Sequence, residues 1–496
     1  MTLASALTGI TPVMQLRPVF LSLGIMVMLL GLAMIPSALV DIARQRAEWP
    51  SFALSAFVTG FFGLCLYILA RGGDMRTGTR ETFLLVVVIW IVLPLFAAIP
   101  FLSSGMGFTD AMFESISGLT TTGATVLTGL DNLPPGLLLW RAILQWIGGI
   151  GIIVTAIAIL PQLGVGGMQL FALESSDHSA KFLSRIRDIA IQMSLVYLIL
   201  TVVCAILYVQ TGMTPFNAIA HAMTTLSAGG YSTHDASLSQ YNETATPWVA
   251  IVFMFVAGLP FVLLARALFR AEPKYLLSNS ELRLFAGLIA VFTAILMAQH
   301  AVSGFARFDN SLQALRDTLF NVISVMTGTG YKNAPYDTWG DPALAAFLII
   351  MFLGGCAGSA ACGLKMLRLE LSAKAVLAHA QKMTFQRRLA PVRFNGRTVS
   401  ETDLQSVMVF VFLYLMTFVV SAVLLAVLGN DMLTSISGAA TSVSNVGPGL
   451  GPVIGPDGTF QTLSTASKWV CAIAMLLGRL EFVPLFALLT RRFWWG

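Results

Sequence analysis

Charged residues are scarce in this sequence. Asp, Glu, Lys and Arg together make up 11% of its 496 residues, whereas roughly a quarter of the residues in a soluble globular domain are charged. Hydrophobic residues make up 56%, and the mean hydropathy is +0.81. A soluble fold cannot hide this much apolar surface from water, but a bilayer accommodates it. The composition therefore argues against a soluble protein and predicts one that crosses a membrane many times.

The patterns that mark enzymes and metal sites are also absent from the sequence. There is no HExxH, no GxSxG and no pair of carboxylates on one face of an expected helix. No GxGxxG follows an expected strand, so no organic cofactor is expected on this chain. The cysteines lie in apolar runs without the spacing of a zinc site or a disulfide framework; they are Cys65, Cys204, Cys356, Cys362 and Cys471. An enzyme is therefore the less favoured class, and ion flux into liposomes would distinguish it from a transporter.

The few charges that do occur follow a membrane pattern. The formal net charge is +5, but the basic residues fall in short loops between apolar runs, which favours membrane orientation over nucleic-acid binding. No Lys or Arg occurs between Ser103 and Trp140 or between Gly212 and Ala265, whereas the alternate loops are basic. The positive-inside rule then predicts that both termini lie in the cytoplasm.

Ten apolar runs have the length that a helix needs to cross hydrocarbon. They lie near residues 19–40, 53–71, 82–101, 136–163, 188–211, 246–270, 281–302, 342–369, 404–429 and 467–490. Four segments between the later runs share one pattern, in which a short half-apolar stretch leads into a cluster of Ser, Thr and Gly. The clusters are residues 118–125, 224–231, 325–331 and 441–448, and they recur about every hundred residues when aligned on Gly123, Gly229, Gly330 and Gly447.

This repetition predicts the fold class. We expect an all-α polytopic membrane protein with four pseudo-fourfold helix–pore loop–helix repeats and two extra N-terminal transmembrane helices. The expected divisions are 1–78 for the two-helix extension and 79–180, 181–276, 277–395 and 396–496 for the four repeats. Short helices are expected at 109–119, 215–225, 315–326 and 433–443. Their C-terminal ends would point at a shared axis, where the negative end of each helix dipole attracts a cation.

The clusters favour a monovalent cation as the transported species. Irregular backbone at membrane depth is tolerated only where it is buried in protein or lines water. A filter replaces the water shell of an ion with rings of carbonyl oxygens, and glycine adopts the required backbone angles without steric cost. We expect the coordinating carbonyls to be those of Thr121, Thr122, Gly123, Ser227, Ala228, Gly229, Gly328, Thr329, Gly330, Asn445, Val446 and Gly447. The predicted ion is K⁺, with some passage of similar ions such as Rb⁺ and Na⁺.

Other polar residues near the clusters have more ordinary explanations. Asp110 and Asp317 precede their glycines by equal offsets, and we expect them to cap the pore helices rather than to bind ions. His221 is expected to pack on its short helix rather than to sense protons, despite the aptitude of histidine for pH switching.

Several stretches carry a resemblance to a known family. They are Gln145-Trp-Ile-Gly-Gly-Ile-Gly-Ile152, Leu160-Pro-Gln-Leu-Gly-Val-Gly-Gly-Met-Gln-Leu170, Gly354-Gly-Cys-Ala-Gly-Ser359 and Asn445-Val-Gly-Pro-Gly449. In this order, along nearly the whole chain, they resemble the Trk/Ktr/HKT superfamily of K⁺ transport proteins, and the extra N-terminal helices fit its bacterial TrkH/TrkG branch. The resemblance implies K⁺ uptake through a gated pore in the bacterial cytoplasmic membrane and a homodimer with one pore in each protomer. It also implies control by a cytoplasmic ring of nucleotide-binding TrkA-type subunits, for which Lys374–Arg397 is a candidate docking surface, although lipid-facing charge explains this stretch equally well.

The resemblance further implies a gate. The glycine-rich segment that interrupts the eighth run becomes an intramembrane gating loop beneath the filter, with tight packing as the alternative; its residues are Gly354, Gly355, Gly358, Ser359 and Gly363, with Lys365 near the cytoplasmic mouth. Arg479, which lies inside the last run where a charge is costly, becomes a pore-facing electrostatic barrier, the alternative being a structural pair with another span. Coupling of K⁺ to H⁺ or Na⁺ remains a second mechanism. Its relay would use intramembrane carboxylates or histidines, and Glu114 and Glu481 form no evident chain, which favours gated passive conduction.

Overall fold

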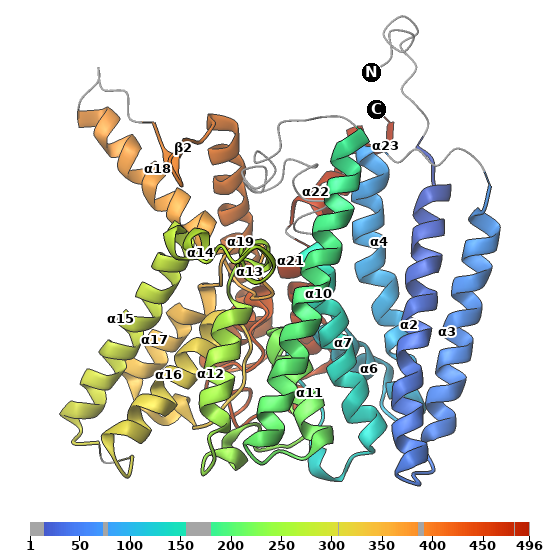
Figure 1. Cartoon of the computed structure of the whole chain (residues 1–496), viewed down its shortest axis with the longest axis horizontal. Coiled ribbons are helices and arrows are strands. Elements are labelled where there is room, and N and C mark those ends of the chain that lie inside the picture. Colours follow the sequence, from blue (N-terminus) through green and yellow to red (C-terminus); the bar gives the residue numbers. More distant parts are fainter. Residues whose placement is uncertain are drawn as a thin grey trace, which may run out of the picture.

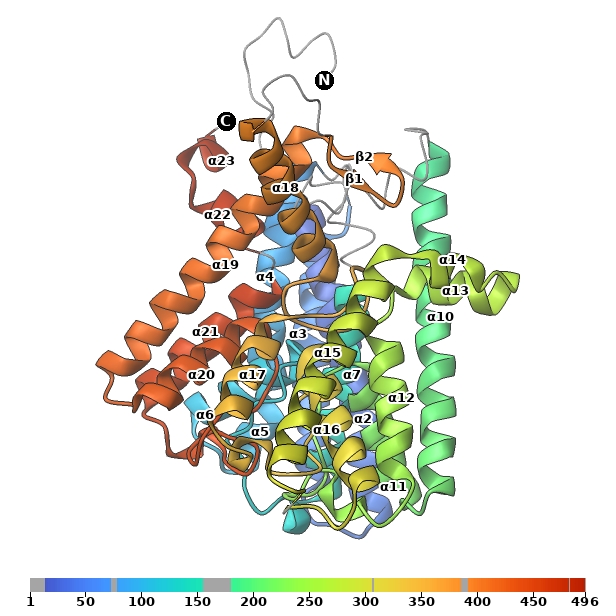
Figure 2. The same ribbon diagram turned by 90° about the vertical axis from the view of Figure 1, so that its left-hand side faces the viewer.

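The computed structural model describes residues 14–72, 78–154, 180–305, 307–384, 391–480 and 482–495. Within these ranges the regular structure is almost entirely helical, and the only strands, β1 (Arg393–Phe394) and β2 (Arg397–Thr398), pair as an antiparallel hairpin. Most of the long helices run roughly along one direction, as two views at right angles show (Figures 1 and 2). The predicted all-α polytopic architecture is confirmed.

The helices of a first set surround the interior of the molecule. They are α2 (Arg17–Ala43), α3 (Trp49–Ala70), α4 (Thr79–Ala97), α7 (Pro135–Val154), α10 (Ala180–Gln210), α12 (Thr246–Ala257), α15 (Ser280–Val302), α17 (Asp341–Phe352), α18 (Met366–Thr384), α19 (Glu401–Val427) and α21 (Thr465–Arg479), joined by the shorter α5 (Ile99–Ser103), α13 (Phe261–Arg270), α14 (Lys274–Ser278), α22 (Val483–Leu489) and α23 (Arg491–Trp495). Among the described residues, six helical stretches are long and apolar enough to cross a membrane. Their outer faces carry exposed apolar side chains such as Phe57 and Leu69 on α3, as a lipid-facing surface requires.

Some predicted spans are broken rather than continuous. The run 246–270 was predicted as one helix, and this is wrong: α12 and α13 meet at a bend of 103°. Pro260 explains the break, because proline disfavours helical angles in the residue before it and cannot donate a backbone hydrogen bond. The run 467–490 is likewise divided, since α21 ends at Arg479 and Phe482, just before α22, has a left-handed φ of +57°. Of the predicted span 136–163, residues 155–163 lie outside the described part of the chain.

The two N-terminal helices form a tightly packed pair. A β-carbon on Gly24 would lie 2.8 Å from the Gly63 carbonyl oxygen, and one on Gly63 would lie 2.8 Å from the Gly24 carbonyl oxygen. Small residues therefore let the two backbones approach closely. The pair is tied to the rest of the molecule by Asp41 near the end of α2, whose carboxylate accepts a hydrogen bond of 2.6 Å from the Gly136 N–H at the start of α7.

The two ends of the described chain lie at one end of the molecule. The start of α2 and the C-terminal α23 are both at the top of Figure 1, together with α18 and the hairpin. Val19 of α2 and Phe493 of α23 pack into one buried cluster with Leu84 of α4. The opposite end carries the turns that lead into four short helices.

These four short helices, which we call the pore helices, lie in the interior. They are α6 (Phe108–Leu119), α11 (Pro215–Leu226), α16 (Ser311–Thr327) and α20 (Met432–Ser444). From the end of the first turn onward nearly every residue of α6 is buried, and most of α20 is buried as well. Each pore helix is followed by a loop with a short 3₁₀ turn, at Leu130–Asn132, Ser239–Tyr241, Tyr336–Thr338 and Phe460–Thr462 respectively.

The prediction that aspartates cap the pore helices needs correction. α16 begins at Ser311, four residues before the predicted start, because the Asn310 side chain caps it by accepting a hydrogen bond from the Gln313 N–H. Asp317 therefore lies inside α16, where its carboxylate pairs with Arg316 at 2.8 Å. Asp110 does lie in the first turn of α6, but that helix has no side-chain cap, and Asp110 forms an ion pair of 2.7 Å with Lys468 of α21.

Asp431 is the aspartate that does cap a pore helix. Its carboxylate accepts a hydrogen bond of 3.0 Å from the Thr434 N–H at the start of α20. Hydrogen bonds from the Thr434 side chain and backbone lower the pKa of Asp431 below its ordinary value of 3.8. A lowered pKa means that the ionised carboxylate stabilises the fold above pH 3.8, and that this contribution is lost as the pH falls through the folded-state pKa.

We therefore expect Asp431→Ala to lower the free energy of unfolding at neutral pH by about 1 kcal/mol. Asp431→Asn should retain most of the stability, because asparagine is an equally good N-cap. Thermal unfolding of the purified protein in detergent measures both. The difference between the wild type and Asp431→Ala should shrink as the pH falls below 3.8, and a difference that grew on acidification would contradict the assignment.

Candidate functional site

The loops that follow the four pore helices adopt one shared turn. In each loop one N–H donates to a carbonyl five residues earlier; the donors are Thr122, Gly229, Thr329 and Val446, at 2.9, 3.0, 2.8 and 3.0 Å. The residue before each donor has a left-handed φ, at Thr121, Ala228, Gly328 and Asn445, and so does the glycine after it, at Gly123, Gly230, Gly330 and Gly447. Four segments that are far apart in the sequence therefore have equivalent backbones.

The four loops close into a ring. A β-carbon on Gly123 would lie 2.0 Å from the Gly229 carbonyl oxygen, and one on Gly230 would lie 1.8 Å from that of Thr329. A β-carbon on Gly330 would lie 2.1 Å from the Val446 carbonyl oxygen, and one on Gly447 would lie 2.7 Å from that of Thr122. Each loop thus contacts the next one and the fourth contacts the first. We call this arrangement the carbonyl ring.

The structure corrects the register of the second loop. Ser227 was predicted as a coordinating residue, but it is the C-cap of α11 and corresponds to Thr120, which is the C-cap of α6. The glycine equivalent to Gly123, Gly330 and Gly447 is Gly230, which was not among the predicted coordinating residues. A signal for it was present, since Gly230-Tyr231 matches Gly330-Tyr331 when the loops are aligned on the tyrosine. The remaining predicted loop residues lie together in the ring.

A cavity opens directly on one side of the carbonyl ring. Its volume is roughly 370 Å³, and all four ring glycines, Gly123, Gly230, Gly330 and Gly447, line it. Two ion pairs involve residues of its wall: the Lys332 ammonium lies 2.5 Å from the Asp457 carboxylate, and His234 pairs with Asp131. The hydrogen bond from His234 lowers the pKa of Asp131 below its ordinary value of 3.8.

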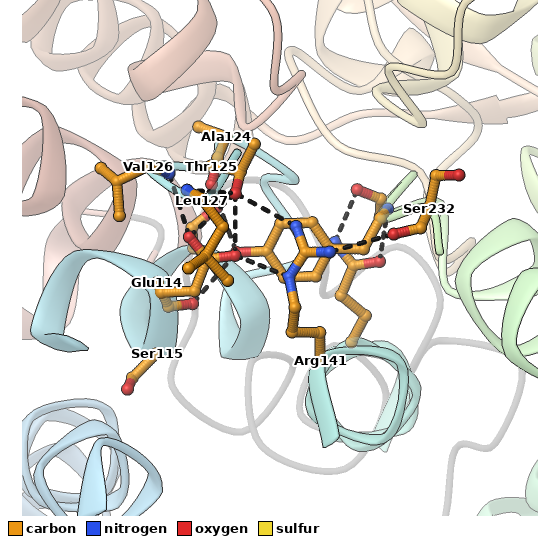
Figure 3. Close-up of polar contacts among 12 residues, drawn as sticks. Glu114, Ser115, Ala124, Thr125, Val126, Leu127, Arg141 and Ser232 are labelled. Carbon is orange, nitrogen blue, oxygen red and sulfur yellow. Dashed lines mark hydrogen bonds and ion pairs between the residues drawn. The ribbon is translucent and has the colours of Figure 1, made fainter. Parts of the chain in front are cut away.

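A buried ion pair contacts both the first and the second loop and connects them. The Arg141 Nε of α7 donates to the Glu114 carboxylate of α6 at 2.7 Å, and both side chains are almost fully buried. Figure 3 shows Glu114 and Arg141 pointing toward one another, with Thr125 and Ser232 as further partners. Arg141 donates to the Thr125 hydroxyl at 3.1 Å and to the Ser232 carbonyl at 3.0 Å. Glu114 is therefore held by a cation and is occupied as an acceptor, which makes it a poor proton carrier.

Two tyrosines connect neighbouring loops. The Arg141 guanidinium stacks on the ring of Tyr231, with Cζ 4.0 Å from the centre of the tyrosine ring. The Tyr231 hydroxyl donates a hydrogen bond of 3.0 Å to the Glu114 carbonyl of α6. Tyr331, at the equivalent position in the third loop, donates to the His221 carbonyl of α11 at 3.1 Å. His221 itself is buried and bonded to Asn217 and Ser232, which agrees with the packing role expected for it.

The segment between α17 and α18 lies against the other side of the ring. The Cys362 N–H donates to the Thr327 carbonyl at the end of α16 at 3.0 Å, and the Gly363 N–H donates to the Ser444 carbonyl at the end of α20 at 2.9 Å. The Cys362 sulfur lies 3.4 Å from the Thr121 hydroxyl. The predicted gating segment therefore contacts three of the four loop bases.

The break between α12 and α13 holds this segment in place. The Cys356 N–H donates to the Gly258 carbonyl at 2.9 Å, and the Phe261 N–H donates to the Gly358 carbonyl at 3.0 Å. Lys365, which was expected near the cytoplasmic mouth, is buried and folds back to donate to the Ala361 carbonyl. Gly358 and Gly363 have left-handed φ values, and Gly354 and Gly355 allow close backbone contacts. Ser359 closes a turn through a hydrogen bond of 2.6 Å to the Cys356 carbonyl.

Arg479 lies at the end of a helix rather than in the middle of one. It is the last residue of α21, and this corrects the prediction of a mid-span position. Its Nη1 lies 3.1 Å from the Cys362 sulfur, and only 5% of the residue is exposed. Within the described part of the chain, Nε and Nη2 have no hydrogen-bond partner. Glu481 lies outside the described residues.

The comparisons with known proteins identify the relatives of this chain. Residues 49–493 match the TrkH family model, described as a cation transport protein. The chain is 36% identical over 480 residues to the Trk system potassium uptake protein TrkI of Halomonas elongata, covering 96% of each chain. It is 34% identical over 492 residues to the potassium uptake protein TrkH of Escherichia coli K12, covering 97% of this chain and all of that one. The crystal structure of the potassium transporter TrkH from Vibrio parahaemolyticus matches with a TM-score of 0.89 and 32% identity, over 97% of this chain and 100% of the other.

Proposed function

Because the chain belongs to the TrkH family of cation transport proteins, we propose that it forms a gated, K⁺-selective pore across the bacterial cytoplasmic membrane. The relatives are named potassium uptake proteins, and the family is one of transporters rather than enzymes. The observation that carries the proposal is the carbonyl ring. Its four loops meet at the C-terminal ends of four pore helices, where helix dipoles favour a cation.

In this proposal, carbonyl oxygens of the ring replace the water shell of K⁺. The coordinating residues are Thr121, Thr122, Gly123, Ala228, Gly229, Gly230, Gly328, Thr329, Gly330, Asn445, Val446 and Gly447, with Gly230 in place of Ser227. Rb⁺ has nearly the size of K⁺ and is expected to pass, whereas the smaller Na⁺ is expected to pass poorly. Among the described residues no cluster of His, Cys, Asp and Glu offers a metal site, so backbone oxygens remain the best ligands.

Ion flux through purified protein in liposomes tests the proposal. We expect K⁺ and Rb⁺ flux with a reversal potential that follows the K⁺ gradient and ignores imposed H⁺ and Na⁺ gradients. The pairing of Glu114 with Arg141 favours this passive mechanism, because it holds that buried carboxylate in an ion pair. A reversal potential that moved with the H⁺ or Na⁺ gradient would favour coupled symport, and an absence of K⁺ flux would contradict transport altogether.

We assign gating to residues 354–363 and Arg479. The segment contacts the ring on the side away from the cavity, and the Arg479 charge lies against it. Two unit charges about 10 Å apart interact by roughly 1.7 kcal/mol at an effective dielectric constant near 20. We therefore expect Arg479→Ala to raise K⁺ flux in liposomes by about tenfold.

Arg368→Ala is the matched control for Arg479→Ala. Arg368, near the start of α18, is also buried, but its guanidinium stacks on the phenyl ring of Phe410, with Cζ 3.6 Å from the centre of that phenyl ring. Its removal should affect stability without raising K⁺ flux. Unchanged flux in a well-folded Arg479→Ala protein, or an equal rise in the control, would argue against the barrier.

The remaining features of the proposal concern assembly. We propose a homodimer with one pore in each protomer, both termini in the cytoplasm, and a TrkA-type nucleotide-binding regulatory subunit as partner. We also propose boundaries at residues 78, 180, 276 and 395 between the two-helix extension and the four repeats. α18 and the hairpin project from the end that holds α23 (Figure 2), which supports Lys374–Arg397 as the docking surface. We expect that neutralising the exposed basic residues of this stretch abolishes binding of the regulatory subunit but leaves the K⁺ flux unchanged.

A further inference from the structure

A single side chain holds the second loop of the carbonyl ring from behind. Gln145 of α7 is fully buried. Its amide nitrogen donates to the Gly229 carbonyl at 2.6 Å, and its amide oxygen accepts from the Tyr231 N–H at 3.0 Å. Gln145 therefore spans the loop and fixes the ring oxygen together with the backbone that follows it.

The second loop differs from the others at the position that Gln145 contacts. The residues equivalent to Gly229 carry side chains, namely Thr122, Thr329 and Val446. The hydroxyls of Thr122 and Thr329 bond to Thr120 and Thr327, within their own loops, at 2.7 and 2.8 Å. The second loop has no such side chain at Gly229, so its bracing comes from another helix.

Gly229 is glycine because of Gln145 and not because of its own backbone. Its φ is not in the left-handed region, unlike that of Gly230. A β-carbon on Gly229, however, would lie 2.4 to 2.8 Å from the three terminal atoms of the Gln145 amide. The Gln145 amide thus occupies the space that a side chain fills in the other three loops.

We propose that Gln145 is a positioning residue that sets the discrimination of the pore between K⁺ and Na⁺. The inference rests on the proposed function, because it takes the Gly229 oxygen as one of the ion ligands. A carbonyl oxygen has two lone pairs, and Gln145 engages one of them, which fixes the oxygen and weakens its pull on an ion. Arg141, one helical turn earlier on α7, anchors the same region through Ser232.

Loss of this restraint should matter more for selectivity than for conduction. Filter selectivity depends on the size of the oxygen cage and on the number and field strength of its carbonyls. Without the Gln145 amide, the Gly229 oxygen gains both freedom to approach a smaller ion and the full strength of its dipole. Both changes favour Na⁺ relative to K⁺.

Gln145→Met and Gln145→Glu test the proposal. Methionine nearly preserves the volume but neither donates nor accepts, whereas glutamate keeps the acceptor for Tyr231 and, when ionised, loses the donor to Gly229. We expect both variants to conduct K⁺ in liposomes and to show a K⁺/Na⁺ permeability ratio, from reversal potentials, that is about tenfold lower than in the wild type. A tenfold change corresponds to about 1.4 kcal/mol.

Gln299→Met is the matched control. Gln299 of α15 also donates to a backbone carbonyl, that of Trp339 at 2.8 Å, but it does not contact the ring. Gln299→Met should lower thermal stability through the loss of this part-buried hydrogen bond, with the permeability ratio unchanged. If either Gln145 variant folds and retains the wild-type ratio, Gln145 is only structural and the proposal is wrong. Failure of the proposed function is distinguishable, because the wild-type liposomes would then show no selective K⁺ flux at all.

Discussion

Gly230→Ala is expected to abolish K⁺ uptake while the helices remain folded. Gly230 has a φ of +70°, and an added β-carbon would lie 1.8 Å from the Thr329 carbonyl oxygen of the next loop. Left-handed backbone angles cost a residue with a β-carbon roughly 1–2 kcal/mol. The steric overlap is larger, and it can be relieved only by moving a ring oxygen away from its place.

Gly304→Ala separates these two effects. Gly304 has a similar φ of +62°, but no atom lies within 4 Å of the added carbon. Gly304→Ala should therefore lower the free energy of unfolding only by the cost of the left-handed backbone angle. It should leave K⁺ uptake near the wild-type level. Uptake can be measured with Rb⁺ as tracer in K⁺-uptake-deficient cells. Normal uptake by a Gly230→Ala protein would contradict the ring geometry.

Arg141→Met is expected to cause the largest loss of stability. Removing one partner of a buried ion pair leaves an uncompensated charge, which costs about 3–5 kcal/mol. Here the stranded group is the Glu114 carboxylate, of which none is exposed, and the change also removes the hydrogen bonds to Thr125 and Ser232. We expect a sharp fall in the melting temperature in detergent and in the amount of folded protein in membranes.

Two further variants test the cause of that loss. Lys374→Met removes an ion pair with Glu370 from the surface of α18, where the lysine side chain is 40% exposed. Such pairs contribute about 1 kcal/mol or less, so the change should be small. Arg141→Met combined with Glu114→Gln should be more stable than Arg141→Met alone, because no buried charge remains. Equal stability of the single and double variants would show that packing, and not charge, dominates.

The convergence of the loops follows from local sequence signals. Ser, Thr and Gly clusters after short half-apolar stretches are unusual in so apolar a chain, and the need to bury irregular backbone predicts a shared axis. The ends of α11 were also predictable, because Pro215 in its first turn and the small residues after Leu226 mark the helix limits. The predicted range 215–225 differs from the observed helix by one residue.

The features that the sequence did not reveal depend on tertiary contacts. Two adjacent glycines, Gly229 and Gly230, made the register of the second loop ambiguous. Only the packing of Gln145 against Gly229 explains why both are glycines. The contacts of Arg141 and Gln145 with the second loop were missed because Ser232 and Gly229, their partners there, lie more than eighty residues away in the sequence. The position of Arg479 was misjudged because hydropathy continues past the end of α21, where backbone geometry ends the helix.

Rb⁺ anomalous scattering from crystals of the wild-type protein tests the central claim most directly. The account predicts a peak on the axis of the carbonyl ring, within coordination distance of the carbonyl oxygens of Thr122, Gly229, Thr329 and Val446. A ring that stays empty in Rb⁺ while peaks form elsewhere in the membrane region would contradict it.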